Sequence, residues 1–331
     1  MSARSVAAHA LAGLACLAAV TTPAAASPVL AGTYDSFLVF GDSLSDPGNL
    51  FAATAGAVPA SPPYAQGRFS NGPVWAEIIA EDFGPGRRYN TAFGGALATT
   101  NADTIPDLGL QLGGFLAGTP PLPTIAPITP GDRPLAAIWA GSNDIFGALA
   151  SDPAQAVAAA EAAAGAVADG LDDLQAAGGV ADFLVFNVPD LGLTPRVEGT
   201  PGQPIASAAS DAFDATLRAL APAPGREVTI VDVLGLSRAL EADPGAFGVS
   251  NTDEPCVVPL GGASGFGPFD ILCDSEADFA ARAFFDRIHP NAVIQTAIAG
   301  AAVDALVPIP ATLLLLGGAV VVLGLARRRQ R

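Results

Sequence analysis

The sequence predicts an α/β protein, a three-layer α/β/α sandwich on a mainly parallel five-stranded sheet. Short apolar runs of strand length alternate with stretches of helical pattern, which is typical of parallel strands joined by helices on both faces of a sheet. Half of the 331 residues are hydrophobic, enough for a sizeable core. The predicted strands lie at about residues 35–41, 88–93, 135–140, 181–188 and 227–233.

The first predicted strand ends abruptly in Gly41, Asp42 and Ser43. Open α/β sheets bind their ligands at the carboxyl ends of their strands, so Ser43 is expected where a nucleophile could act. Pro73 suits the first turn of a helix that we expect to continue through Phe83.

The second predicted strand ends at Gly94 and Gly95. Residues 118–134 are rich in proline and are therefore expected to form a surface connection. The third strand follows it and ends just before Asn143, which places this side chain at the same edge of the sheet as Ser43.

The later helices have recognisable ends. Pro153 is typical of a first helical turn, and Gly178 and Gly179 predict the end of the alanine-rich helix that follows. A further helix is expected at about residues 205–221. Pro290 opens the last predicted helix, which runs through Ala305.

An irregular region, residues 244–275, contains Cys256 and Cys273. In an exported protein an even pair of cysteines in such a loop favours a disulfide over two free thiols. A zinc site is the other reading, and it would need carboxylates to complete its ligands.

The composition excludes several classes of function. The chain has no lysine, which excludes a lysine Schiff base and the lysine of a phosphate-binding loop. Its formal net charge of −17 argues against nucleic acid as a partner, because phosphate binding depends on a positive surface.

Both ends of the chain have the pattern of targeting segments. Residues 1–26 combine an early arginine, an apolar run and three alanines, which predicts a cleavable signal peptide. A single domain is expected over residues 33–305. Residues 309–326 are uncharged and long enough to span a bilayer, and arginines follow them, so residues 307–331 predict a membrane anchor with the body outside.

The residues 307–311 ahead of this span also resemble the Pro-Glu-Pro carboxyl-terminal sorting signals (PEP-CTERM) of Gram-negative bacteria, with Ile309 in place of the usual glutamate. That resemblance implies processing by an exosortase.

The predicted body contains one histidine, His289, so any histidine base must be this residue. A serine hydroxyl needs such a base to become a nucleophile, and Ser43 is the candidate. Asp286 precedes His289 by three residues and could fix its tautomer. Asp42 and Asp46 are expected to hold the nucleophile loop through hydrogen bonds; a metal site there is the alternative.

Four blocks of sequence resemble the GDSL or SGNH family of serine esterases and lipases: Phe40-Gly41-Asp42-Ser43-Leu44-Ser45-Asp46, Asn90-Thr91-Ala92-Phe93-Gly94-Gly95, Gly141-Ser142-Asn143-Asp144 and Asp286-Arg287-Ile288-His289-Pro290. The resemblance spans about residues 35–305. The first block is followed by a further one, Gly67-Arg68-Phe69-Ser70-Asn71-Gly72-Pro73-Val74-Trp75. These sequences are similar to those of the bacterial phospholipase, lecithinase and haemolysin branch of this family.

This resemblance implies the flavodoxin-like SGNH-hydrolase fold and a triad of Ser43, His289 and Asp286. It also implies an oxyanion hole made by the backbone N–H groups of Ser43 and Gly95 and the side-chain amide of Asn143, with Gly94 as the alternative to Gly95.

We therefore expect an exported serine ester hydrolase, a lipase or esterase acting through an acyl-enzyme without a metal or cofactor. Its partners would be an ester or lipid substrate and, through the tail, a membrane. The alternatives are a polysaccharide acetylesterase, which the fold and triad also permit, and a non-catalytic anchored surface or matrix protein.

Overall fold

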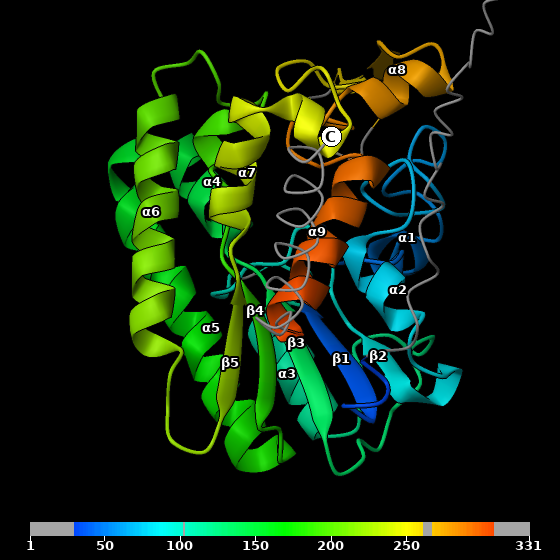
Figure 1. The fold of residues 1–331 in the computed structure, drawn as a ribbon, viewed down its shortest axis with the longest axis vertical. Helices are drawn as coiled ribbons and strands as arrows, with labels where there is room; N and C mark the ends of the chain where they lie inside the picture. The colour runs from blue at the N-terminus through cyan, green and yellow to red at the C-terminus, as the bar shows by residue number, and fades with distance from the viewer. Residues whose placement is uncertain (1–29, 102, 261–266, 308–331) are drawn as a thin grey trace, which may run out of the picture.

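The computed structural model describes residues 30–101, 103–260 and 267–307. At its centre lies a five-stranded sheet in the order β2-β1-β3-β4-β5 (Figure 1). All four neighbouring pairs are parallel, which confirms the predicted sheet. The strands are β1 (Ser36–Gly41), β2 (Arg88–Asn90), β3 (Pro134–Trp139), β4 (Asp182–Phe186) and β5 (Glu227–Val231).

The two central strands, β1 and β3, are buried along their whole length. Covered strands of this kind carry continuous apolar sequences, which is why these two were easy to predict. In their register Gly41 lies opposite Trp139. The segments that follow the two strands, one with Ser43 and one with Asn143, therefore begin side by side.

Helices cover both faces of the sheet, as predicted. α3 (Leu108–Leu116), α4 (Ser142–Ser151), α5 (Ala156–Gly178) and α6 (Gln203–Leu220) pack on the face that carries Leu38 and Ile138. α2 (Trp75–Ala80), α7 (Val233–Ala242) and α9 (Ala292–Leu306) pack on the face that carries Phe37 and Trp139. Alternate residues of β1 thus enter the two apolar layers.

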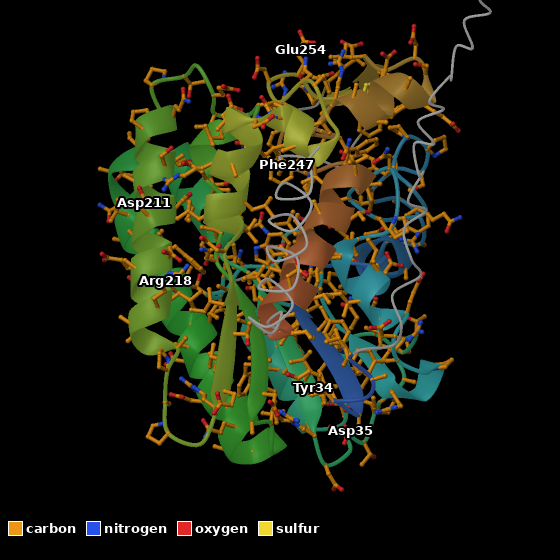
Figure 2. All side chains as sticks on the ribbon, viewed as in Figure 1. Tyr34, Asp35, Asp211, Arg218, Phe247 and Glu254 are labelled. Carbon is orange, nitrogen blue, oxygen red and sulfur yellow. A yellow bond between two sulfur atoms is a disulfide. The ribbon has the colours of Figure 1, made fainter. Side chains whose placement is uncertain are left out.

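Ion pairs join the two helical layers around the β5 edge. Asp211 and Arg218 project from α6 in Figure 2. Asp211 pairs with Arg238 of α7 at 2.9 Å, and Arg218 pairs with Asp232 at the start of α7 at 3.7 Å. These charges are exposed, so each pair stabilises the fold by less than about 1 kcal/mol.

The predicted helix ends differ from the observed ones by a few residues. The helix expected from Pro73 begins at Trp75, where the Glu77 carboxylate accepts the N–H of Val74 at 3.1 Å, and it ends at Ala80. The alanine-rich helix α5 ends where Gly179 takes a left-handed φ of 67°. This matches the predicted glycine stop.

Among the helices that cover the sheet, α3, α4 and α7 were absent from the sequence prediction. Each has at most 10 residues, and such short helices depend on tertiary packing more than on their own pattern. α4 also begins with Ser142 and Asn143, polar residues that suggested a turn.

Residues 256–260 and 267–273 are here called the cap. It holds an antiparallel pair, β6 (Val257–Pro259) and β7 (Phe269–Ile271), within a region predicted to be irregular. The sulfur atoms of Cys256 and Cys273 lie at the distance of a disulfide bond, with their Cα atoms 4.9 Å apart. The two cysteines pack in one apolar cluster with Tyr64, Phe69 and Phe285. The short helices α1 (Asn49–Ala53) and α8 (Glu276–Ala281) complete the fold.

The predicted signal peptide, residues 1–26, and the predicted sorting and anchor segment after Val307 lie outside the described residues. Within residues 30–101, 103–260 and 267–307, no helix has the length and apolar character needed to cross a membrane.

Candidate active site

The end of β1 at Gly41 packs closely against β3 and is hydrogen-bonded to α3, and these contacts position Ser43. A Cβ at Gly41 would collide with the carbonyl oxygen of Trp139, so this position requires glycine. The buried Gln111 side chain of α3 accepts the N–H of Gly41 at 2.8 Å and donates to its carbonyl oxygen at 2.8 Å. The loop that carries Ser43 therefore starts from a rigid point.

Ser43, His289 and Asp286 form one continuous set of contacts. The Oγ of Ser43 lies 2.7 Å from Nε2 of His289, and Nδ1 of the same ring lies 2.7 Å from Oδ2 of Asp286. All three side chains are buried, with exposed fractions of 7% or less. The residues come from opposite ends of the chain, and the fold brings them together in the order that nucleophilic catalysis requires.

Asp286 is surrounded by hydrogen-bond donors. Its Oδ1 accepts the N–H groups of Ile288 and His289 at 2.9 and 2.8 Å, and the phenol of Tyr64 donates to Oδ2 at 2.6 Å. Burial acts to raise the pKa of Asp286, but the charge of His289 and these hydrogen bonds outweigh it and hold the pKa below its usual value. The carboxylate therefore stays ionised.

The His289 segment is braced by the block of residues 67–75. The ring of Phe69 lies 4.9 Å from the His289 ring. Ser70 donates to the carbonyl of Pro290 at 3.1 Å, and Asn71 accepts the first N–H of α9 at 2.8 Å. This block thus packs against the imidazole and fixes the backbone that follows it.

Asp46 holds the nucleophile loop, as the sequence suggested. Its carboxylate accepts backbone N–H groups from Gly48 at 2.7 Å, Leu50 at 3.2 Å and Gly94 at 2.8 Å. Burial is the main cause that raises the pKa of Asp46 to about 6. Both oxygens are engaged by the backbone, so the group has the structural role that was expected.

Asp42 is the other buried carboxyl of this loop. Its Oδ1 accepts the N–H of Leu44 at 2.9 Å, while Oδ2 has no hydrogen-bond partner among the described residues. Burial raises the pKa of Asp42 to about 7. A group beside Ser43 thus changes its charge near neutral pH.

The backbone donors near Ser43 can be distinguished by their partners. The N–H of Gly94 is used by Asp46, whereas those of Gly95 and Ser43 have no hydrogen-bond partner within the described part of the chain. Gly95 is therefore a better candidate than Gly94 for binding an oxyanion.

Asn143 lies in the first turn of α4 and reaches the same region. Its amide donates to the carbonyl of Ala96 at 2.9 Å, which ties it to the turn at Gly95 and leaves its second N–H available. Ser43, Asn143 and His289 line one small cavity of about 20 Å³. The structure thus brings the sequence-predicted residues together.

Two residues of this site were missed by the sequence reasoning. Tyr64 lies in a loop rich in proline and alanine, with no periodic pattern that would mark it. Gln111 lies in α3, which was not predicted. Only the fold relates Tyr64 to Asp286, 222 residues away in the chain, so no local signal could have found it.

Within the described ranges, side chains of the kind that can bind a metal ion also lie close together at a place away from Ser43. Carboxylate oxygens of Glu198, Glu241 and Asp253 lie within 4.8 Å of one another. Burial, followed by the charges of Asp253 and Glu241, raises the pKa of Glu198. No histidine or cysteine joins this group, and acidic side chains alone do not identify a metal site.

The model of the GDSL-like lipase/acylhydrolase family matches residues 37–302. Phosphatidylcholine-sterol acyltransferase of Aeromonas hydrophila is 31% identical over 249 residues, which cover 71% of this chain and 68% of that protein. Thermolabile hemolysin of Vibrio parahaemolyticus is 27% identical and esterase EstA of Pseudomonas aeruginosa 29% identical, covering 66% and 86% of this chain. This chain spans about half the length of these two, 50% and 48%.

Among solved structures, phospholipase A1 from Streptomyces albidoflavus NA297 aligns with a TM-score of 0.45 and 14% sequence identity. The alignment covers 82% of this chain and 99% of that one.

Proposed function

The chain belongs to the GDSL-like lipase/acylhydrolase family and is an ester-bond hydrolase, and we propose that it is an exported serine esterase or lipase acting through an acyl-enzyme. The observation that carries this proposal is the unbroken set of contacts from Ser43 through His289 to Asp286. A serine activated in this way is suited to attack a carbonyl carbon.

In the first half of the reaction, Oγ of Ser43 bonds to the ester carbonyl carbon while Nε2 of His289 takes the hydroxyl proton. Asp286 remains ionised and stabilises the imidazolium that forms. The tetrahedral intermediate then breaks its bond to the alcohol oxygen, which receives the proton from His289. The alcohol leaves, and the acyl group stays on Ser43.

In the second half, a water molecule gives a proton to His289 and its oxygen bonds to the acyl carbon. The bond to Oγ breaks, and Ser43 regains the proton from His289. The products are the free carboxylic acid and the original enzyme.

Both tetrahedral intermediates carry an oxyanion that needs preorganised donors. We assign this role to the backbone N–H groups of Ser43 and Gly95 and to the amide of Asn143. Support comes from the lack of other partners for the two N–H groups within the described residues and from the tie between Asn143 and Ala96.

The substrate proposed is a lipid ester. Relatives named for phosphatidylcholine-sterol acyl transfer, haemolysis and esterase activity support a substrate with an acyl chain. An acetylated polysaccharide and a non-catalytic anchored surface or matrix role remain as outcomes that an assay can favour.

The assay that tests this proposal follows hydrolysis of nitrophenyl esters, a phospholipid and an acetylated polysaccharide by residues 27–307, with the Ser43→Ala variant as the control. We expect hydrolysis of the nitrophenyl and lipid esters, lost in the variant. Cleavage of the polysaccharide alone would assign the acetylesterase function. A body that cleaves none of them would contradict an ester-bond hydrolase and favour the non-catalytic surface or matrix role.

We further propose export by residues 1–26 and anchoring by residues 307–331, with exosortase processing of that tail. The patterns of these segments and the disulfide pairing of Cys256 with Cys273 support this location. Intact-mass measurement of protein from the native host tests it. Mature chains should begin at Ser27 and lack Arg331. If Arg331 is retained, the tail is a membrane anchor that is not processed. If Met1 is retained, export through a cleaved signal peptide is contradicted.

A further inference from the structure

An apolar cavity of about 60 Å³ lies between α7 and α9, beside the sheet. Its walls include Trp139 at the end of β3, Leu236 and Leu240 of α7, and Ile294 and Ile298 of α9. This volume is several times the 10–15 Å³ that one water needs, so the cavity has room for part of an apolar ligand.

This cavity adjoins the cavity of the nucleophile. Leu44, Pro189 and Ile288 line both of them. Leu44 directly follows Ser43, and Ile288 directly precedes His289. These three side chains are therefore what separates the apolar cavity from a group attached to the carbonyl carbon above Ser43.

Five polar side chains line the cavity, and four of them, all but the Glu241 carboxylate of α7, are engaged with described residues of the protein. Thr194 donates to the carbonyl of Leu191 at 2.7 Å, and Ser237 donates to the carbonyl of Leu234 at 2.9 Å. Asp190 forms an ion pair with Arg238 at 2.8 Å. Apolar cavities of this kind exclude water and bind apolar ligands.

We propose that this cavity binds the acyl chain of the ester substrate and sets its length. This inference rests on the proposed function for the position of the carbonyl carbon at Ser43. From there the chain passes Leu44 and Ile288 and follows α9 from Ile294 to Ile298, about 6 Å along the helix axis. A cavity of this size holds a short to medium chain, and a long chain must leave part of its length outside.

A second cavity beside the site provides the alternative location. It measures about 280 Å³, includes Leu149 and Arg196, and shares Phe146 with the nucleophile cavity. Arg196 makes this cavity polar and charged, so it is less suited to an acyl chain and better suited to the alcohol part of the ester.

The test measures kcat/KM for nitrophenyl acetate, butanoate, hexanoate, octanoate and hexadecanoate. Each methylene that enters the cavity should raise kcat/KM by up to about fourfold, until the cavity is full. Ile298→Phe, which fills the far end, should lower the octanoate-to-acetate ratio of kcat/KM at least about tenfold. Ile298→Ala, which enlarges the same end, should move the preferred chain to a longer one.

Leu149→Phe is the matched control, because it adds the same bulk to the other cavity and should leave the ratio unchanged. A ratio that responds to Leu149→Phe and not to the two Ile298 variants would overturn the proposal. So would a wild-type enzyme that cleaves all five esters with equal kcat/KM. Melting temperatures of the variants separate a changed preference from a damaged fold.

A binding measurement keeps this test independent of catalysis. Trp139 lines the cavity and is one of two tryptophans in the chain, so its fluorescence can report occupancy in the Ser43→Ala variant. Octanoate should change the emission in a saturable way, and adding Ile298→Phe should abolish the change. Saturable binding without ester hydrolysis by the wild type would disprove the proposed function alone; hydrolysis with no saturable signal would disprove the acyl site alone.

Discussion

The phenol of Tyr64 donates a 2.6 Å hydrogen bond to Oδ2 of Asp286, the same oxygen that lies 2.7 Å from the His289 ring. Tyr64 touches no reacting atom in the proposed mechanism. It is a positioning residue, because it fixes the carboxylate that in turn orients the imidazole. The cap reaches the site here, since Tyr64 packs against Phe269 of β7 and against Phe285.

Tyr64→Phe should lower kcat by roughly tenfold with little change in KM, because a hydrogen bond to a charged group is lost. Without this donor the pKa of Asp286 should rise and its charge should favour the protonated form of the general base more strongly, so the acid limb of the pH–rate profile should move to higher pH. Tyr89→Phe is the matched control, since the buried Tyr89 hydroxyl has no partner among the described residues. Equal rates and equal profiles for the two variants would show that the Tyr64 contact has no role in positioning.

Asp42 should make the protein less stable as the pH rises. Its pKa is raised from 3.8 to about 7 in the fold, so between these values the folded state binds the extra proton. The stabilisation is present below about pH 4 and is lost as the pH rises through about 7, a change of about 4 kcal/mol. Asp46, with a pKa raised to about 6, adds a loss of the same sign over a narrower range.

Asp42→Asn resembles the protonated carboxyl and should flatten this dependence. Urea unfolding between pH 4 and pH 8 measures it, with the exposed Asp132→Asn as the control. If the free energy of unfolding of Asp42→Asn falls with pH as steeply as that of the wild type, the buried Asp42 is not the group that titrates.

Asn143→Ala should lower kcat by about a hundredfold, because one of three proposed oxyanion donors is removed. KM should change little if the amide acts mainly on the intermediate. The variant also loses the bond to Ala96, and so does Asn143→Asp, which keeps the shape but offers no N–H; the melting temperatures of both variants separate a damaged fold from a lost donor. Near-normal kcat in both variants would exclude Asn143 from the oxyanion hole.

The pairing of Cys256 with Cys273 closes a loop with a sequence separation of 17. Under the chain-entropy model a disulfide over such a loop stabilises the protein by about 3 kcal/mol. The double variant Cys256→Ser, Cys273→Ser should lose about that much in urea unfolding. Thiol titration of the unreduced, unfolded body, residues 27–307, should find no free thiol, and finding two would contradict the bond.

The parts of the fold that could be predicted share a physical cause. β1 and β3 are buried on both faces, so their sequences are continuous apolar runs. Ser43 and His289 could be assigned because each has a recognisable block of sequence, and the predicted body offers a single histidine. Gly95 was left beside Gly94 as an alternative, and the bond from Gly94 to Asp46 now favours Gly95.

The parts that could not be predicted depend on contacts between distant segments. The hydrogen bonds of Gln111 to Gly41 cross 70 residues of chain, and those of Tyr64 to Asp286 cross 222. The apolar cavity likewise exists only because α7 and α9 pack on the same face of the sheet with the cavity between them. A short helix such as α3 has too weak a pattern to predict, although it carries the side chain that fixes the end of β1.

The measurement that tests the central claim most directly compares Ser43→Ala, His289→Ala and the double variant in the hydrolysis of one nitrophenyl ester. Residues that act as a unit lose their effect together, so each single variant should lower kcat by several orders of magnitude and the double variant by little more. In parallel, a serine-directed phosphonate should add the mass of one phosphonyl group to the wild type, at Ser43. Turnover should fall in proportion to the fraction of protein modified. Near-normal hydrolysis by either single variant, or continued turnover with Ser43 fully modified, would contradict the acyl-enzyme mechanism.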